Sequence, residues 1–169
     1  MRIGLSDGLT ADEHARLVAF APQFAARCAD LASYGLPETL HHDDFHDANI
    51  FVRDGRYALA DWGESCVAHP FSTLLVNQRG IAYRLGFLGA EHQRPETTRL
   101  RDAYLEPWTT YASRAELLAA SVLARQLAMA GRAMTWHHVV SRLTGPDREA
   151  EADAVPGWLQ VFLGSGLLD

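Results

Sequence analysis

Apolar residues at helical spacing occupy both ends of the chain and enclose one short segment with a β-type pattern. In the first forty residues they recur every three or four positions, at Phe20, Phe24, Cys28 and Leu31. This spacing predicts helix. Thr10 can cap a helix reaching about residue 19. Because proline is poorly tolerated inside a helix, we expect a second helix over residues 22–33.

The β-type segment consists of two short apolar runs, residues 50–52 and 57–60, that flank Arg53-Asp54-Gly55-Arg56. Asp-Gly between apolar runs is typical of a two-residue hairpin turn. An antiparallel hairpin returns the chain close to its start. The spacing therefore predicts that Asn49 and Asp61 lie together at the open end.

The remaining pattern predicts helices. They are expected over residues 70–85, 95–105, 114–130 and 132–143, with Gly131 breaking or kinking the last two apart and a capping box at Ser113 and Glu116. Residues 144–153 are polar and predicted to be a loop, and a last amphipathic helix ends near Gly166. We therefore expect one domain, residues 1–169, that is mainly α with one small β-hairpin.

Composition narrows the class of protein. The 169 residues are 48% hydrophobic, carry a net charge of −6 and contain two cysteines. Without a basic block, a nucleic-acid partner is not expected, and no apolar run approaches membrane length. These features favour a globular cytoplasmic protein in a reducing compartment. All fifteen basic residues are arginine, so no mechanism can use a lysine of this polypeptide.

Chemistry-bearing residues are densest over residues 41–47, which hold three histidines and three aspartates around Phe45. Adjacent carboxylates repel one another and resist desolvation, so such a group needs a cation, a proton or a phosphate–metal complex. Turn and cap chemistry is the alternative explanation for Asp44, Asn49 and Asp61.

The order of these residues resembles a known motif. His42-Asp43-Asp44-Phe45-His46-Asp47-Ala48-Asn49, a hairpin and then Asp61-Trp62 are similar to the catalytic half of the aminoglycoside phosphotransferase family, which shares the protein-kinase-like fold with choline and homoserine kinases. The family motif has glycine at the position of Asp43 and leucine at that of Phe45.

The resemblance implies a role for each matching residue. Asp44 would accept the proton of a small-molecule hydroxyl acceptor, and Asn49 and Asp61 would bind Mg²⁺ against the phosphates of ATP. His42 and His46 would mainly fix the backbone of the catalytic loop. These roles suit phosphoryl transfer, which depends on positioning and on charge neutralisation by hard oxygen ligands.

Two departures from the family pattern affect the expected activity. Thr73 stands where the family has an aspartate that anchors a helix, so that contact is lost or replaced. The family also has an N-terminal β-lobe with a phosphate-binding lysine, whereas the forty residues before the motif predict helices. We therefore expect the C-terminal lobe only, with weak ATP binding. A complementing N-terminal lobe or a homodimer through the exposed lobe face would be its partner.

Other polar and aromatic residues receive weaker predictions. His41 is interpreted as a polar loop residue, Asp43 and Asp47 as tuning the charge of the loop, and Trp62 as core packing. Trp136-His137-His138 is interpreted as an ordinary helix face and residues 147–153 as a solvated acidic run. By analogy with the family, the candidates for contact with the acceptor are Glu91, Asp102, Glu106 and Trp108.

Two other functions remain open at this point. His42 and His46 superficially match the two histidines of a zinc-protease motif, but that chemistry needs both on one helical face and a glutamate in place of Asp43. Alternatively, the chain is a non-catalytic remnant lobe that acts as a binding or self-association module, because an exposed inter-lobe face would be partly apolar.

Overall fold

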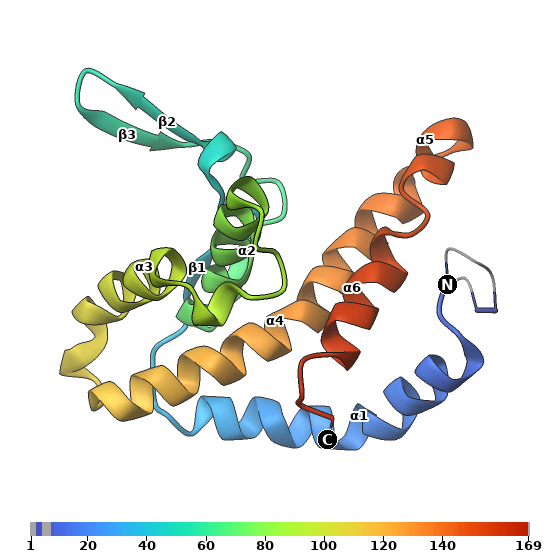
Figure 1. The fold of residues 1–169 in the computed structure, drawn as a ribbon, viewed down its shortest axis with the longest axis horizontal. Coiled ribbons are helices and arrows are strands. Elements are labelled where there is room, and N and C mark those ends of the chain that lie inside the picture. Colours follow the sequence, from blue (N-terminus) through green and yellow to red (C-terminus); the bar gives the residue numbers. More distant parts are fainter. Residues whose placement is uncertain (1–2, 5–7, 169) are drawn as a thin grey trace. The chain divides into compact units, whose positions relative to one another are not determined.

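The computed structural model describes residues 3–4 and 8–168 and is mainly helical (Figure 1). Its α-helices are α1 (Ala11–Ala32), α2 (Leu74–Leu85), α3 (Pro95–Leu105), α4 (Arg114–Arg142), α5 (Gly145–Ala150) and α6 (Ala154–Leu163). Short 3₁₀ helices are η1 (Asp47–Asn49), η2 (Pro70–Thr73), η3 (Glu91–Gln93) and η4 (Glu106–Thr110). The predicted mainly α fold with a small hairpin is confirmed.

Two antiparallel strand pairs complete the described structure. β2 (Ile50–Arg53) and β3 (Arg56–Leu59) form the predicted hairpin. Asp54 and Gly55 at its turn have φ angles of 51° and 72°, as the favoured two-residue turn requires. A second pair, β1 (Thr39–His41) with β4 (Cys66–Ala68), was not predicted and places His41 opposite Cys66.

By internal contacts the chain divides into two compact units. Unit 1 comprises Met1–Asp30 and Gln126–Asp169, and unit 2 comprises Leu31–Arg125. The boundary near residue 125 falls inside α4, and all residues of the predicted catalytic motif belong to unit 2. The single domain over residues 1–169 stays a prediction.

The core of unit 2 forms around Phe71, whose side chain is 0% exposed. Its ring meets Tyr104 and Trp108 edge-on, with centroids 6.2 and 5.6 Å away. Further buried side chains come from α2, α3 and the start of α4: Leu74, Leu75, Leu105 and Leu117. This core fixes η2 and α2, against which the loop of the predicted catalytic motif is built.

His69 caps η2. Its Nδ1 accepts a hydrogen bond from the backbone N–H of Phe71 at 3.3 Å. Burial lowers the pKa of His69 to about 4, because the charged ring would lose its hydration. The imidazole is therefore neutral near pH 7 and can act as an acceptor at the start of the helix.

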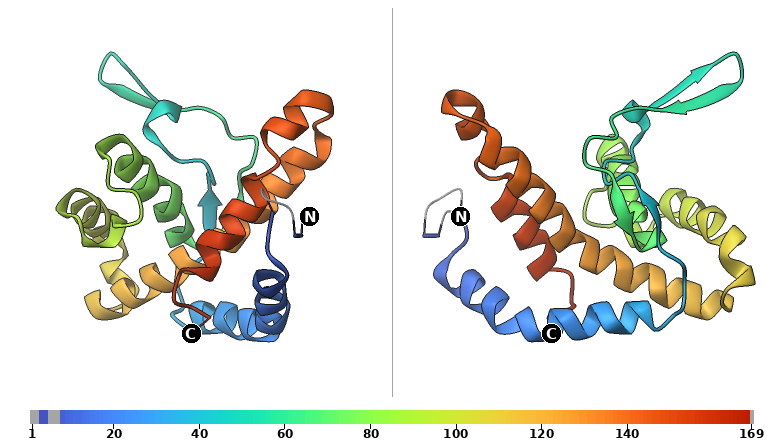
Figure 2. Two further views of the ribbon diagram at one scale, coloured as in Figure 1. Left: turned by 45° about the vertical axis from the view of Figure 1, so that its right-hand side comes forward. Right: turned by 180° about the vertical axis from the view of Figure 1, so that it is seen from behind.

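In unit 1, aromatic side chains join α1 to α6. Phe20 and Phe24 each meet Phe162 edge-on at 5.9 Å. Contrary to prediction, α1 continues through Pro22 as one helix, which Figure 2 shows changing direction along its length. Proline removes one hydrogen bond and kinks a helix. Contacts with Phe162 on both sides of Pro22 stabilise the continuation.

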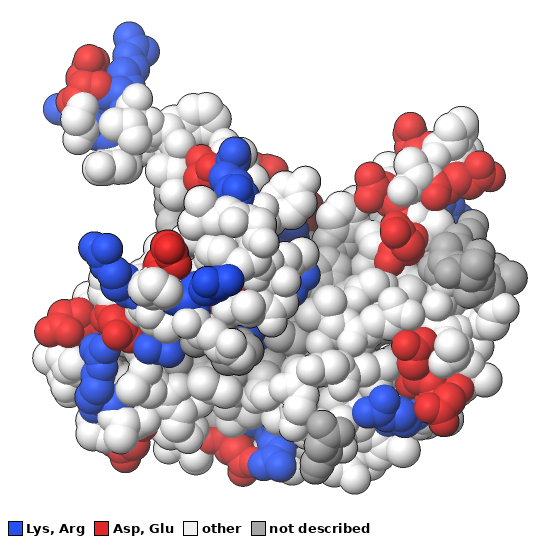
Figure 3. All heavy atoms as spheres, in the orientation of Figure 1, with Lys and Arg blue, Asp and Glu red and all other residues white. Residues whose placement is uncertain are grey.

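The C-terminal region differs from prediction in two further places. α4 runs through Gly131 without a break, because a single glycine inside a long helix costs only about 1 kcal/mol. Residues 145–150, predicted to be loop, form α5. The acidic side chains there lie at the surface, as predicted, and Figure 3 shows them gathered over α5. None of the described helices combines the length and the apolar character needed to span a bilayer.

Candidate active site

The candidate active site is built on the loop that leads from β1 into the hairpin. This loop begins with an unusual turn: the N–H of Asp44 donates to the carbonyl of His42 at 2.8 Å, around Asp43 with a φ of 61°. A bond between residues two apart closes a γ-turn, and positive φ at its centre is the rare, strained variant. Aspartate tolerates this conformation better than most residues, and glycine best. Glycine, the residue at this position of the family motif, would adopt this backbone without strain.

Asp44 lies at the centre of a cluster of side chains. The side-chain amide of Asn49 donates to the backbone carbonyl of Asp44 at 3.0 Å and to Asp44 Oδ2 at 3.4 Å. His46 Nε2 lies 3.3 Å from the same Oδ2. Because His46 Nδ1 accepts from the N–H of Ala48 at 3.2 Å, its Nε2 carries the proton and donates to Asp44. The carboxylate is 23% exposed, so it is held in place and still reachable from solvent.

Asn49 and Asp61 lie at the open end of the hairpin, as predicted. The N–H of Ala60 donates to the carbonyl of Asn49 at 3.0 Å, one step beyond the paired residues Ile50 and Leu59. Asp61 follows with a φ of 61°, which turns the chain away from β3. The described contacts of Asn49 use its amide nitrogen and its backbone, so its amide oxygen is the atom that a cation could bind.

His42 connects the loop to the end of β3. Its Nε2–H donates to the carbonyl of Ala60 at 2.7 Å, and its ring lies against Trp62 at 4.6 Å and Phe45 at 6.0 Å. Its buried Nδ1 has no partner among the described residues. These contacts give His42 a structural position beside Asp61. Trp62 was predicted to be core packing, but its side chain is 41% exposed and lies against the ring of His42.

His41 is not the polar loop residue that the sequence suggested. It ends β1, is 6% exposed, and contacts Thr73 and Asp43 through its two ring nitrogens. Asp43, predicted to tune surface charge, is 9% exposed. Thr73 therefore makes a replacement contact where the family pattern has an aspartate. No local pattern marks this network, because Thr73 lies 32 residues from His41.

Helix α2 closes the other side of the loop. A Cβ atom added to Gly80 would lie 3.3 Å from Cβ of His46, so glycine permits this close approach. Asp47 forms an ion pair with Arg84 at 2.6 Å, and the hydrogen bond with this guanidinium holds the pKa of Asp47 below its usual value. Asp47 thus contributes to loop placement at the surface.

The residues suggested for acceptor contact have structural partners. Glu91 is 3% exposed, forms an ion pair with Arg79 at 3.3 Å and accepts from the N–H of Gly89 at 3.1 Å. Trp108 packs on Phe71. Asp102 and Glu106 both face Arg114, at 3.0 and 3.7 Å.

The donor set fits magnesium better than zinc. Asn49 and Asp61 offer hard oxygen atoms, and Mg²⁺ is commonly held by one or two protein ligands together with substrate phosphates. Zinc needs three or four nitrogen, sulfur or carboxylate ligands. Within the described residues no three His, Cys, Asp or Glu side chains come together as a metal site. Residues 42–46 also form a loop, so His42 and His46 share no helical face.

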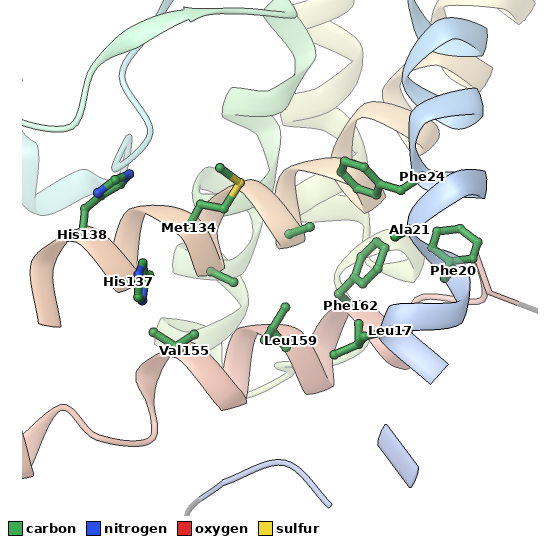
Figure 4. Close-up of a pocket in the computed structure, with 12 residues that line it drawn as sticks. Leu17, Phe20, Ala21, Phe24, Met134, His137, His138, Val155, Leu159 and Phe162 are labelled. Atoms are coloured by element: carbon green, nitrogen blue, oxygen red, sulfur yellow. The ribbon is translucent and has the colours of Figure 1, made fainter. Parts of the chain in front are cut away.

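A separate apolar groove lies within unit 1, between α1, α4 and α6 (Figure 4). Its volume is about 610 Å³. Phe20, Phe24 and Phe162 lie at one end, and His137 and His138 lie at the other. These two histidines were interpreted from the sequence as part of an ordinary helix face, whereas in the structure they line a groove.

Comparison with known proteins identifies the family of this chain. A family model described as the phosphotransferase enzyme family matches residues 4–117, which is more than half of the 169 residues and includes residues 41–47 and the hairpin. No curated protein and no solved structure matches the chain. The match confirms the family that the motif predicted: the chain belongs to the phosphotransferase enzyme family.

Proposed function

We propose that this protein is an ATP-dependent phosphotransferase that transfers the γ-phosphate to a hydroxyl of a small molecule, with unit 2 serving as the catalytic part of a kinase-like C-terminal lobe. The observation that carries the proposal is the cluster around Asp44. One accessible carboxylate is held by His46 and Asn49, and Asn49 is itself tied to the hairpin end that carries Asp61.

Asp44 acts as the general base in this proposal. The acceptor hydroxyl donates a hydrogen bond to the Asp44 carboxylate and passes its proton there as the hydroxyl oxygen forms a bond to the γ-phosphorus. The bond between that phosphorus and the bridging oxygen of ADP breaks, and ADP leaves. His46 and Asn49 keep the carboxylate aimed at the acceptor, which matters because much of the catalysis is positioning.

Mg²⁺ would be held by the amide oxygen of Asn49 and the carboxylate of Asp61. When bound, the ion neutralises charge on the ATP phosphates. The positive φ of Asp61 lets the chain leave β3 at once, so that its side chain stays at the open end of the hairpin.

Calorimetric titration of the full chain with Mg²⁺–ATP tests the proposal. We expect binding by the native protein and its loss in Asp61→Ala. Asp54→Ala is the matched control, because Asp54 is also an aspartate with positive φ but lies at the opposite end of the hairpin. Equal binding by the native protein and Asp61→Ala would contradict the assignment, as would absence of binding at millimolar nucleotide.

Self-association is a second candidate function, and exposed apolar side chains of the hairpin favour it. Phe51 is 56% and Tyr57 76% exposed, and a lone two-stranded hairpin is marginally stable in water. A second copy of the chain could cover these side chains. Sedimentation equilibrium would show a dimer that Tyr57→Glu dissociates, whereas a monomer at all concentrations would exclude this function.

A further inference from the structure

His41 forms a bridge between the catalytic loop and the helical frame of unit 2. We propose that His41 is a positioning residue, which holds Asp43 in its left-handed conformation and thereby fixes the direction in which the loop presents Asp44. The catalytic consequence rests on the proposed function, but the structural consequence at Asp44 can be measured without it.

The two ring nitrogens of His41 have distinct partners. Nε2 lies 3.1 Å from Asp43 Oδ1, and Nδ1 lies 2.8 Å from Thr73 Oγ1. A carboxylate can only accept, so Nε2–H donates to Asp43. In the neutral imidazole Nδ1 then accepts from the hydroxyl of Thr73. One tautomer therefore satisfies both contacts.

Asp43 needs such a partner for two reasons. Its side chain is almost completely buried, and an ionised carboxylate in that position requires hydrogen bonds. Its φ of 61° is also unfavourable for a residue with a Cβ atom, and conformations of this kind persist only where the surroundings impose them. The bond from His41 gives the buried carboxylate a hydrogen-bond donor. It also opposes relaxation of the Asp43 φ angle to a negative value.

The position of Asp44 follows from that turn. Its N–H closes the γ-turn by donating to the carbonyl of His42 at 2.8 Å. If Asp43 relaxed to negative φ, the backbone would leave the turn in a different direction and the Asp44 side chain would move with it. Asn49 and His46 contact Asp44 directly, whereas His41 acts on the preceding residue, Asp43.

Thr73 ties His41 to the helices of unit 2. It is the last residue of η2, the short helix that leads into α2. The hydroxyl of Tyr104 in α3 donates to the carbonyl of Pro70 in the same turn at 2.9 Å. Burial raises the pKa of Tyr104, so its hydroxyl stays protonated and available as the donor to Pro70. His41 thus contacts a turn that α3 holds through Tyr104.

The test is a double-substitution cycle read at Asp44. His41→Leu removes both contacts at similar size, and Asp43→Gly removes the carboxylate and the strain of positive φ together. We expect His41→Leu to shift the Asp44 ¹³Cγ resonance and to lower kcat roughly 10- to 100-fold, with little change in the Kd for Mg²⁺–ATP. In the Asp43→Gly background, the same substitution should leave the resonance in place and change kcat less than about threefold.

Two conservative variants separate positioning from bulk stability. His41→Gln places an amide N–H near the position of Nε2, so it should restore most of the native Asp44 resonance and kcat. Thr73→Val removes only the hydroxyl and should shift the resonance in the same direction as His41→Leu but by less. His137→Leu, a histidine substitution in unit 1, is the matched control and should change neither quantity.

Clear results would overturn the proposal. An unchanged Asp44 resonance in folded His41→Leu would do so. An equal effect of His41→Leu in the native and in the Asp43→Gly background would also do so. If His41→Leu does not fold, the other two variants decide. A native Asp44 resonance in Thr73→Val, together with a failure of His41→Gln to restore the resonance, would also overturn the proposal. Absence of Mg²⁺–ATP binding by the native chain would instead contradict the proposed function, because the resonance cycle does not depend on nucleotide.

Discussion

The catalytic loop and the hairpin that follows it are neighbours in sequence, but they are stabilised in different ways. In the loop, hydrogen bonds from side chains fix the conformation: His42 bonds to the carbonyl of Ala60, Asn49 to the carbonyl of Asp44, and His41 to the side chain of Asp43. In the hairpin, backbone pairs hold the strands from Ile50↔Leu59 to Arg53↔Arg56, while most of the side chains lie in solvent.

This difference separates two tasks. The hairpin sets register, because its first pair, Ile50 and Leu59, brings Asn49 and Asp61 to the same end. Strand pairing of this kind is made by the backbone and is compatible with many different side chains. In the proposed function the loop sets direction, because the Asp44 carboxylate must point at the acceptor. We therefore expect substitutions in the loop to affect chemistry strongly and substitutions on the hairpin to be tolerated.

Asp44→Asn should give the largest effect. It removes the proton acceptor but keeps an oxygen for the bonds from His46 and Asn49, so turnover should fall roughly 10²- to 10⁴-fold while the fold is retained. Phosphate transfer measured with an acceptor, alongside circular dichroism, checks this. Asp54→Asn at the hairpin turn is the matched control, and comparable losses in both variants would remove the distinction between loop and hairpin.

Paired phenylalanine substitutions test the same contrast in stability. Phe71→Ala empties the centre of the unit 2 core and should lower the free energy of unfolding by about 3–5 kcal/mol. Phe51→Ala on the exposed hairpin should change it by less than about 1 kcal/mol. Urea unfolding measures both, and a large loss in Phe51→Ala would show that the hairpin face is covered in solution.

Asn49→Asp separates the two roles of Asn49. The variant keeps oxygen ligands for a cation but loses the N–H donors to Asp44 and places two carboxylates side by side. Turnover should fall roughly 10- to 100-fold, because hydrogen bonds to charged groups contribute about 1.5–3 kcal/mol. Mg²⁺–ATP affinity, measured by calorimetry, should be retained. Loss of affinity with normal turnover would reverse the assignment.

The effect of His69 should be small and visible only as a pH dependence of stability. Its pKa is about 4 in the folded protein and near 6.5 when unfolded, so the unfolded chain binds more protons between these values. The free energy of unfolding should therefore fall as pH falls from about 6.5 to 4, by about 1–2 kcal/mol after allowance for partial exposure. His69→Asn keeps an acceptor for Phe71 and should flatten this slope; an unchanged slope would assign it to other groups.

The sequence predicts the features that depend on local patterns. The Asp-Gly turn between apolar runs predicted the hairpin and the location of Asn49 and Asp61 at its open end. Capping residues also marked helix starts, and Ser113 and Glu116 form the predicted reciprocal bonds, with Ser113 N–H donating to Glu116 at 2.8 Å. These signals are contained within a few residues.

Features that depend on distant residues were missed. β1 and β4 have three residues each, too few for a periodic pattern, and they pair across the whole catalytic loop. His41 and Glu91 are polar residues whose burial is decided by Thr73 and Arg79 elsewhere in the chain. The predicted helix break at Pro22 was wrong, because the helix is stabilised on both sides of the proline by Phe162, which lies near the other end of the sequence.

The turn between β2 and β3 offers a place to attach a reporter. Asp54 and Gly55 form an exposed loop tip, the kind of site at which proteins accept insertions and labels. The four residues of β2 span about 13 Å, so a fluorophore at the tip would lie within energy-transfer distance of a nucleotide analogue held at Asn49. The exposed strands, where we expect substitutions to be tolerated, could thus make occupancy of the proposed site visible in real time.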